Sequence, residues 1–154
     1  MVNITQTLLK KQVKGHNLKK VSVISLSALM IENITELEVL ERLLNLDLSR
    51  NAIKKIQGLT SMKWLTKLDL SLNKLTKIEG LSSCKSLQFL NLSHNRISRI
   101  ATLKLIPKLR ELNLRSNKLK VLDGIGNSSE IRILNLSDNK ISKIVPFTYQ
   151  NSKL

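Results

Sequence analysis

One arrangement of apolar residues recurs along this chain with a strict 22-residue period, and no other feature constrains the fold as strongly. The frame reads Leu-x-x-Leu-x-Leu-x-x-Asn from Leu43 to Asn51. It begins again without insertion at four later positions: Leu65, Leu87, Leu109 and Ile131. A more degenerate copy begins at Val21, where Leu29 replaces the asparagine. A period of this length indicates stacked equivalent units, since no single unit can bury its apolar face alone.

The period divides the chain into units with defined boundaries. Residues 1–20 are expected to form an N-terminal helical cap before the repeats, and residues 153–154 follow the repeats as a tail or as the start of a continuation. Between these ends we expect six equal coils, at 21–42, 43–64, 65–86, 87–108, 109–130 and 131–152.

Each frame predicts the same local structure. Its first half alternates apolar and polar residues, which is typical of a short strand with one buried face. Such strands can pair in parallel with those of the neighbouring coils at a spacing of about 4.8 Å. The second half has threefold apolar spacing, as at Ile56, Leu59 and Met62, which favours a short 3₁₀ or helical turn behind the sheet.

An asparagine ends every complete frame, at the point where the chain must turn away from the sheet. This turn leaves backbone donors and acceptors without partners in the sheet, and an asparagine amide offers both groups on a short stem. We therefore expect a structural ladder of stacked asparagines that bind the backbone of the turns. Its members are Asn51, Asn73, Asn95, Asn117 and Asn139.

The repeat is identified as a leucine-rich repeat. Its 22-residue form, complete from Asn73 to Leu81, resembles the subfamily typified by the protein phosphatase 1 regulatory subunit and outer-arm dynein light chain 1. The resemblance implies an α/β leucine-rich repeat solenoid with a parallel concave sheet. It also implies a non-catalytic adaptor in the cytoplasm, in the cytoskeleton, at the centrosome or in the cilium. Members of the subfamily bind unrelated partners, so the resemblance fixes the fold better than the function.

The two ends of the stack differ in character. An apolar stripe of Ile4, Leu8, Leu9 and Val13 predicts an N-terminal helical cap over residues 3–14, which begins at Thr5 or Asn3 and ends at Gly15. At the other end, the last copy carries Pro146 and Phe147 where an Ile-x-Gly-Leu pattern is usual. Either these residues and Tyr149 fold over the last coil, or the natural chain continues as part of a longer multidomain protein, which we favour. We expect residues past Asn139 to be the least ordered.

Candidate catalytic and metal-binding residues are few. Asp47 and Asp69 occupy equivalent positions in adjacent coils, and carboxylates about 5 Å apart could share a proton or bind a metal. Asparagine replaces them in the later coils, which favours a structural role. The single cysteine, Cys84, takes a core position and excludes an internal disulfide and a thiolate zinc site. We expect no enzymatic activity, no cofactor and no metal, and no apolar run reaches the ~18 residues of a membrane-spanning helix.

Charge suggests a partner. Lysine and arginine number 26 against 11 acids, for a net charge of +15. Many of these cations occupy the first or the fourth position after a ladder asparagine, and stacking would align them into a basic stripe beside the sheet. A solubilising edge, an acidic protein partner, and nucleic acid or anionic lipid all remain open, but an aromatic content of 3% disfavours nucleic acid. The residues of the basic stripe are Lys55, Lys74, Lys77, Arg96, Arg99, Lys118, Lys140 and Lys143.

The strongest candidate for partner binding is the exposed, concave face of the sheet. Phe89 is the only aromatic residue at its strand positions, and we expect it to lie beside Leu72, Ile133 and several arginines, a composition typical of a binding hot spot. The candidate residues are the positions of the strands that the repeat leaves free: Leu44, Asn45, Arg50, Lys67, Leu72, Gln88, Phe89, His94, Arg110, Glu111, Arg115, Arg132, Ile133 and Asp138.

Overall fold

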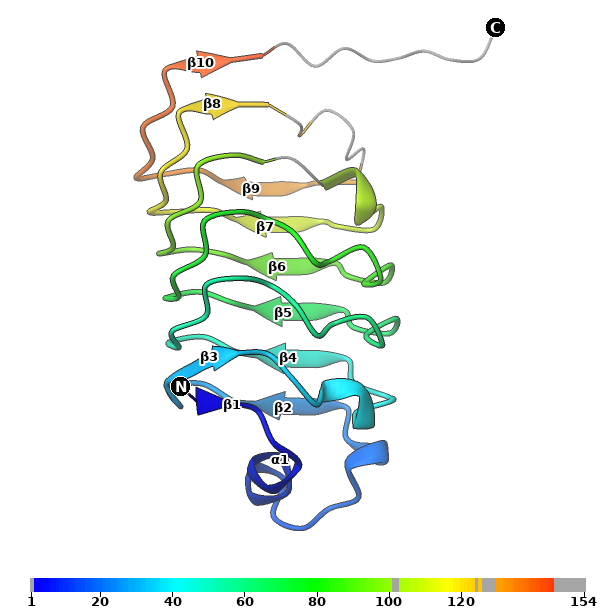
Figure 1. The fold of residues 1–154 in the computed structure, drawn as a ribbon. Coiled ribbons are helices and arrows are strands. Elements are labelled where there is room, and N and C mark those ends of the chain that lie inside the picture. The colour runs from blue at the N-terminus through cyan, green and yellow to red at the C-terminus, as the bar shows by residue number, and fades with distance from the viewer. Residues whose placement is uncertain (1, 101–102, 124, 126–129, 146–154) are drawn as a thin grey trace, which may run out of the picture.

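The computed structural model describes residues 2–100, 103–123, 125 and 130–145 as a single stack of coils (Figure 1). One parallel sheet of six short strands runs along the stack. The expectation for Pro146, Phe147 and Tyr149 concerns residues outside this described part of the chain. In spatial order the strands are β2 (Val23–Ser25), β4 (Asn45–Asp47), β5 (Lys67–Asp69), β6 (Phe89–Asn91), β7 (Glu111–Asn113) and β9 (Ile133–Asn135).

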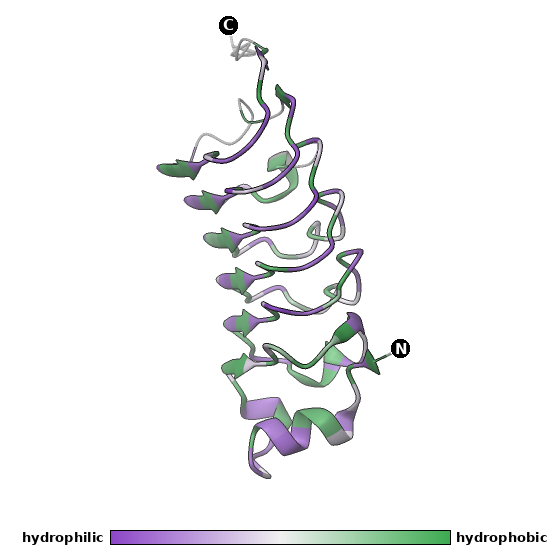
Figure 2. Ribbon diagram, turned by 90° about the vertical axis from the view of Figure 1, so that its left-hand side faces the viewer, coloured by the Kyte–Doolittle hydropathy of each residue, from purple (hydrophilic) through white to green (hydrophobic). Residues whose placement is uncertain are grey.

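The register of the sheet follows the sequence period. Leu46 pairs with Leu68, which pairs with Leu90, and each step equals one repeat, without a bulge. The central residue of every strand points into the core and the two flanking residues point outward, as the alternation of a strand requires. Figure 2 shows hydrophilic and hydrophobic residues within each of these short strands. The parallel-sheet solenoid predicted from the sequence is therefore confirmed.

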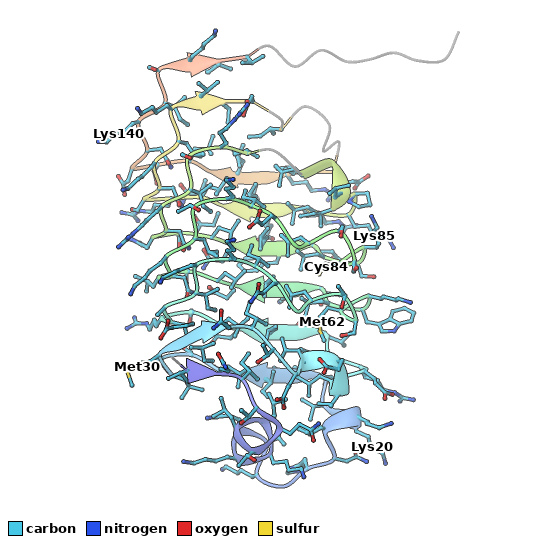
Figure 3. The ribbon with its side chains drawn as sticks, viewed as in Figure 1. Lys20, Met30, Met62, Cys84, Lys85 and Lys140 are labelled. Atoms are coloured by element: carbon cyan, nitrogen blue, oxygen red, sulfur yellow. The ribbon has the colours of Figure 1, made fainter. Side chains whose placement is uncertain are left out.

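The core is a set of apolar columns, because each framework position stacks on its counterpart in the neighbouring coil. Within the 65–86 coil, Cys84 takes the position that Met62 holds in the preceding coil, and both side chains are buried. Figure 3 shows them on the same side of the stack. Burial raises the pKa of the Cys84 thiol to about 11, because a low-dielectric environment disfavours the thiolate. Cys84 therefore behaves as a small apolar residue.

The return leg of each coil has little regular structure. Among the described residues, two coils contain 3₁₀ turns, η2 (Leu37–Val39) and η3 (Leu103–Leu105). In other coils a single hydrogen bond between residues i and i+3 closes a turn, such as the bond from Met62 N–H to Leu59 C=O at 3.1 Å. Two small parallel pairs complete this side, where β1 (Val2–Asn3) pairs with β3 (Ile31–Asn33) and β8 (Val121–Leu122) with β10 (Lys143–Ile144).

The N-terminal cap is smaller than the sequence predicts. Its helix, α1 (Gln6–Gln12), begins after Thr5, whose Oγ1 accepts a hydrogen bond from Leu8 N–H at 3.2 Å. It ends earlier than expected because Lys14, with φ of 51°, already has the left-handed conformation, and Gly15 N–H bonds back to Lys10 C=O. This 6→1 bond is that of a Schellman motif. The 3₁₀ turn η1 (Leu18–Lys20) then leads into the sheet.

The first coil holds the cap through polar contacts. Glu36 Oε2 accepts a hydrogen bond from Gln6 N–H at 2.9 Å, which satisfies a free donor of the first helical turn. Thr35 Oγ1 donates to Ile4 C=O at 2.7 Å. The cap thus covers the N-terminal end of the core with Ile4 and Leu9, which are fully buried, and shields the edge of the stack from water.

The ladder asparagines bind the backbone at the end of each strand. Asn73 Nδ2 donates to the carbonyls of Leu48, Leu70 and Ser71, while its Oδ1 accepts from Ile53 N–H at 3.0 Å. The same pattern is present at Asn51, Asn95, Asn117 and Asn139. Since the partners come from two coils, every amide joins its own coil to the preceding one.

A left-handed residue precedes the ladder position in every coil and turns the chain out of the sheet. These residues have φ between 54° and 58°, and none is glycine. Each N–H except the last bonds to the next coil, as Leu72 N–H does to Ser93 C=O at 2.9 Å. The set comprises Ala28, Arg50, Leu72, His94, Ser116 and Asp138. Four of the proposed concave-face residues therefore lie in turns rather than in strands: Arg50, Leu72, His94 and Asp138.

Candidate partner-binding surfaces

The outward side of the sheet, here called the sheet face, consists of two rows of side chains. The first row contains the first residue of each strand, in the order Val23, Asn45, Lys67, Phe89, Glu111 and Ile133. The second row contains the third residue, in the order Ser25, Asp47, Asp69, Asn91, Asn113 and Asn135. Of the fourteen candidates, only five are strand residues of the first row. Four others precede the strands: Leu44, Gln88, Arg110 and Arg132.

Phe89 does not lie in the setting that the sequence suggested. Its register partners are Lys67 on β5 and Glu111 on β7, so charged residues of opposite sign flank the half-buried ring. Ile133 is two strands away, and Leu72 lies in the turn after β5. The expected cluster of Phe89 with Leu72 and Ile133 is therefore wrong. A ring between an ammonium and a carboxylate can instead contribute both apolar contact and polar selectivity.

A shallow hollow of about 230 Å³ lies on the N-terminal half of the sheet face. Residues of four strands line it, from Val23 on β2 to Phe89 on β6, and they include Asp47, Lys67 and Asp69. A second hollow of about 460 Å³ adjoins it between β2 and the cap. Both hollows share Val23, Ile24 and Ser25, so one continuous concave surface extends from the cap onto the sheet.

Sequence reasoning missed the residues on the cap side of this surface. Val23 and Ser25 belong to the degenerate first copy, where the frame is hardest to place, while Gln12 and His16 lie outside the repeats. The available signal in the sequence was the frame position of Val23, which is equivalent to that of Phe89. In the structure, the Val23 side chain is 61% accessible.

Asp47 and Asp69 occupy paired positions on β4 and β5, and hydrogen bonds hold both carboxylates. Asp47 accepts from Ser49 N–H at 2.9 Å and from Ser25 Oγ at 2.7 Å. Asp69 accepts from Ser71 N–H at 2.8 Å and from Asn91 Nδ2 at 2.9 Å. Partial burial by itself would raise the pKa of Asp47, but the bonds from Ser49 and Ser25 outweigh it and lower the pKa below its usual range.

A lowered pKa of Asp47 argues against a proton shared between the two aspartates, which would require a raised value. Within residues 2–100, 103–123, 125 and 130–145, no group of three or more histidine, cysteine or acidic residues is arranged to hold a metal ion. The two carboxylates give the hollow a local negative charge in an otherwise basic protein. They also tie consecutive strands together through Ser25 and Asn91.

An ion pair marks the C-terminal half of the sheet face. Arg115 Nε donates to Asp138 Oδ2 at 2.8 Å, and Ser116 Oγ donates to the same oxygen at 3.2 Å. The Arg115 hydrogen bond, then the one from Ser116 and the Arg115 charge, lower the pKa of Asp138, with a smaller contribution from His94. Arg110 and Arg132 are also exposed, at the start of β7 and β9 and thus at the opposite ends of these strands from the pair. Asp47 and Asp69 thus lie on the half of the face near the cap, and Arg110, Arg115 and Arg132 lie on the far half, where Glu111 and Asp138 accompany them.

The basic stripe lies on the edge where the chain leaves the sheet, and Lys140 marks that edge in Figure 3. All eight of its side chains are exposed. Arg99 approaches Asp123 to 3.8 Å, the one ion pair of the stripe within the described residues. No helix in that part of the chain is long and apolar enough to cross a membrane.

The sequence matches a family model described as leucine-rich repeats (two copies) at residues 41–83, 63–105 and 107–149. These matches extend over more than half of the chain, which therefore belongs to the leucine-rich repeat family. Proteins of this family are in general non-catalytic scaffolds for protein interactions. No curated protein sequence matches the chain significantly.

Several solved structures share the fold. A leucine-rich repeat protein of Leptospira interrogans is 30% identical, with a TM-score of 0.79 over 88% of this chain and 36% of its own. The internalin InlF of Listeria monocytogenes is 28% identical, with a TM-score of 0.66 over 77% of this chain and 35% of its own. TLR13, solved with single-stranded RNA, shares the fold at 22% identity and a TM-score of 0.67, over 97% of this chain and 25% of its own. This chain thus spans about a third or less of the length of these structures.

Proposed function

We propose that this protein is a scaffold that binds a partner protein on the sheet face, with the main contact at the hollow around Phe89. The supporting observation is the continuous concave surface from the cap to β6, which combines an aromatic ring, an exposed valine and two carboxyl groups. A mixture of aromatic and charged groups at a recess is the composition in which binding energy concentrates.

Rigidity supports this proposal. Strands in fixed register, with the turns bound by ladder asparagines, place the side chains of the sheet face before a partner arrives. A preorganised surface loses little conformational entropy on association, so more of the contact energy appears as affinity. The sheet face needs no rearrangement to receive a folded partner.

We also propose a narrower place within the family. The pattern from Asn73 to Leu81 supports membership of the 22-residue subfamily of the protein phosphatase 1 regulatory subunit and outer-arm dynein light chain 1. By that likeness, the chain acts as an adaptor or regulatory subunit in the cytoplasm, on the cytoskeleton or in the cilium.

Site-specific photo-crosslinking in cells tests the binding surface. A photoreactive phenylalanine analogue replaces Phe89 in one variant and Trp64, an exposed aromatic residue outside the strands, in a matched control. We expect position 89 to yield a discrete crosslinked protein that position 64 does not yield. Lys67→Ala combined with Glu111→Ala should then remove the crosslink without changing the melting temperature. Equal yields from the two positions, or a crosslink that survives both substitutions, would contradict the proposal.

A further inference from the structure

The segments that follow the ladder asparagines carry most of the unbalanced charge of the protein. Residues 52–57, 74–79, 96–101, 118–123 and 140–145 contain ten lysines and arginines and only two acids. Since these segments occupy equivalent places in consecutive coils, their cations gather along one edge of the stack. This edge is distinct from the sheet face, where the carboxylates of Asp47 and Asp69 lie.

Four of these cations form an unbroken column, here called the edge column. It comprises Lys74, Arg96, Lys118 and Lys140, one from each of four consecutive coils. Their backbones are fixed, because every N–H bonds to the preceding coil, as Arg96 N–H does to Leu75 C=O at 2.8 Å. Successive members are therefore about 4.8 Å apart, and the column is roughly 14 Å long.

The side chains of the edge column are free to meet a ligand. All four are exposed, and within the described residues none forms an ion pair with an acid. Lys77 and Arg99 lie three positions further along their coils and broaden the basic stripe. Four like charges at this spacing repel one another, and an anionic partner of matching length would relieve that repulsion.

We propose that the edge column binds an acidic α-helix of a partner protein, whose carboxylates recur every three to four residues on one face. Such carboxylates advance by about 5.3 Å at each step, since a helix rises about 1.5 Å per residue. Over the three steps from i to i+11, the helix rises about 16.5 Å against about 14.4 Å for the column, a mismatch of about 2 Å that lysine and arginine side chains can absorb. This surface is independent of the hollow around Phe89.

Nucleic acid fits the edge column less well. The phosphates of a duplex strand wind around the axis and leave a straight contact line within a few base pairs. Single strands are usually held on aromatic stacking platforms. The aromatic residues within the described part of the chain are Trp64 and Phe89, and neither belongs to the segments that form this edge.

Fluorescence anisotropy with two synthetic peptides tests the proposal on the full chain. The first peptide is a helix former with glutamates at i, i+4, i+7 and i+11, and the second has the same composition with the glutamates spread around the helix. We expect the first to bind about tenfold more tightly at low salt, with an affinity that falls as salt rises. Equal affinities for the two peptides would overturn the proposal, as would tighter binding of a single-stranded RNA or a DNA duplex of equal charge.

Matched variants separate the edge column from net charge. The test variant changes the four column residues to glutamine, and the control variant changes Lys10, Lys11, Lys63 and Lys108, which are also exposed. The test variant should lose roughly 30-fold in affinity for the first peptide and the control less than about threefold. Equal losses would mean that total charge alone drives binding and would refute the column. Circular dichroism and thermal melting of both variants verify that the coils remain folded.

Discussion

Asn95 gives the sharpest test of how the coils are held together. Its Oδ1 accepts a hydrogen bond from Leu75 N–H at 3.0 Å, and its Nδ2 donates to the carbonyls of Leu70, Leu92 and Ser93 at 2.9 to 3.2 Å. The side chain is buried, so water cannot readily replace it. Asn95→Ala would leave one backbone donor and three acceptors without this partner.

The cost follows from these contacts. A buried donor without a partner, here Leu75 N–H, costs about 1–3 kcal/mol, and the loss of the three hydrogen bonds from Asn95 Nδ2 adds to it. Each of the three carbonyls keeps another donor, which limits this addition: Asn73 Nδ2 at Leu70, Asn117 Nδ2 at Leu92 and Leu72 N–H at Ser93. We therefore expect Asn95→Ala to lower the free energy of unfolding by about 2–4 kcal/mol, or the melting temperature by roughly 5–12 °C for a chain of this length. Because neighbouring coils stabilise one another, an interior defect should also make unfolding less cooperative.

Two matched variants serve as controls for the loss of unfolding free energy expected for Asn95→Ala. Asn139→Ala removes the same amide from the last described frame, where it is only partly buried and water can substitute. Asn91→Ala removes a half-buried amide of the sheet face that bonds Asp69 and Ser93. Each should cost less than about 1 kcal/mol. Urea denaturation followed by circular dichroism measures all three variants, and the reasoning fails if Asn95→Ala costs no more than the other two.

Three further predictions concern single residues. Gly80→Ala should destabilise the fold by about 2–4 kcal/mol, because φ is 72° and a Cβ would collide with the Ile56 carbonyl oxygen, whereas Gly15→Ala meets open space and should cost about 1 kcal/mol in thermal melts. Cys84, buried and with a pKa of about 11, should react with thiol reagents at pH 8 only at the rate of unfolding, and prompt labelling of the native protein would contradict its core position. Asp47 has a lowered folded-state pKa, so its stabilisation is full above the unfolded pKa and is lost as pH falls through the folded value. Urea titrations should show the stability difference between wild type and Asp47→Asn shrinking below about pH 4, and a constant difference would refute this.

The sequence predicted the stacking and the register of the sheet because the period is strict. Leu46, Leu68 and Leu90 recur at the same frame position in consecutive coils, so any parallel pairing in another register would expose one of them. The position of the asparagines also followed from the frame, since a turn after each strand needs an amide. These features depend on the repeat alone and therefore follow from the sequence.

The neighbours of Phe89 could not be predicted in the same way. The exposed positions were treated as one set, whereas the fixed register places Lys67 and Glu111 directly beside the ring and separates it from Ile133. The left-handed turn was missed because its residues share no side-chain type, from Ala28 to Asp138. Glycine, the usual signal for such a turn, is absent from all six positions.

The first coil shows how tertiary contact compensates for a degenerate frame. Leu29 stands where later coils have asparagine, and it cannot bind the turn. Asn51 Oδ1 from the next coil accepts hydrogen bonds from both Leu29 N–H, at 3.1 Å, and Ile31 N–H, at 2.9 Å. One amide of the second coil thus serves two donors of the first, a solution that the local sequence of the first coil does not reveal.

Because the register is constant from coil to coil, the length of the stack changes by a fixed amount with each repeat. An inserted or deleted copy would meet the same backbone groups above and below, so the chain could change length in whole copies without refolding the rest. Each added copy would move the carboxylates near the cap away from the arginines at the far end by one strand spacing, about 4.8 Å. A change in the number of repeats could then adjust the distance between two binding sites on this protein to the distance between their contact points on a partner, without changes in the contact residues themselves.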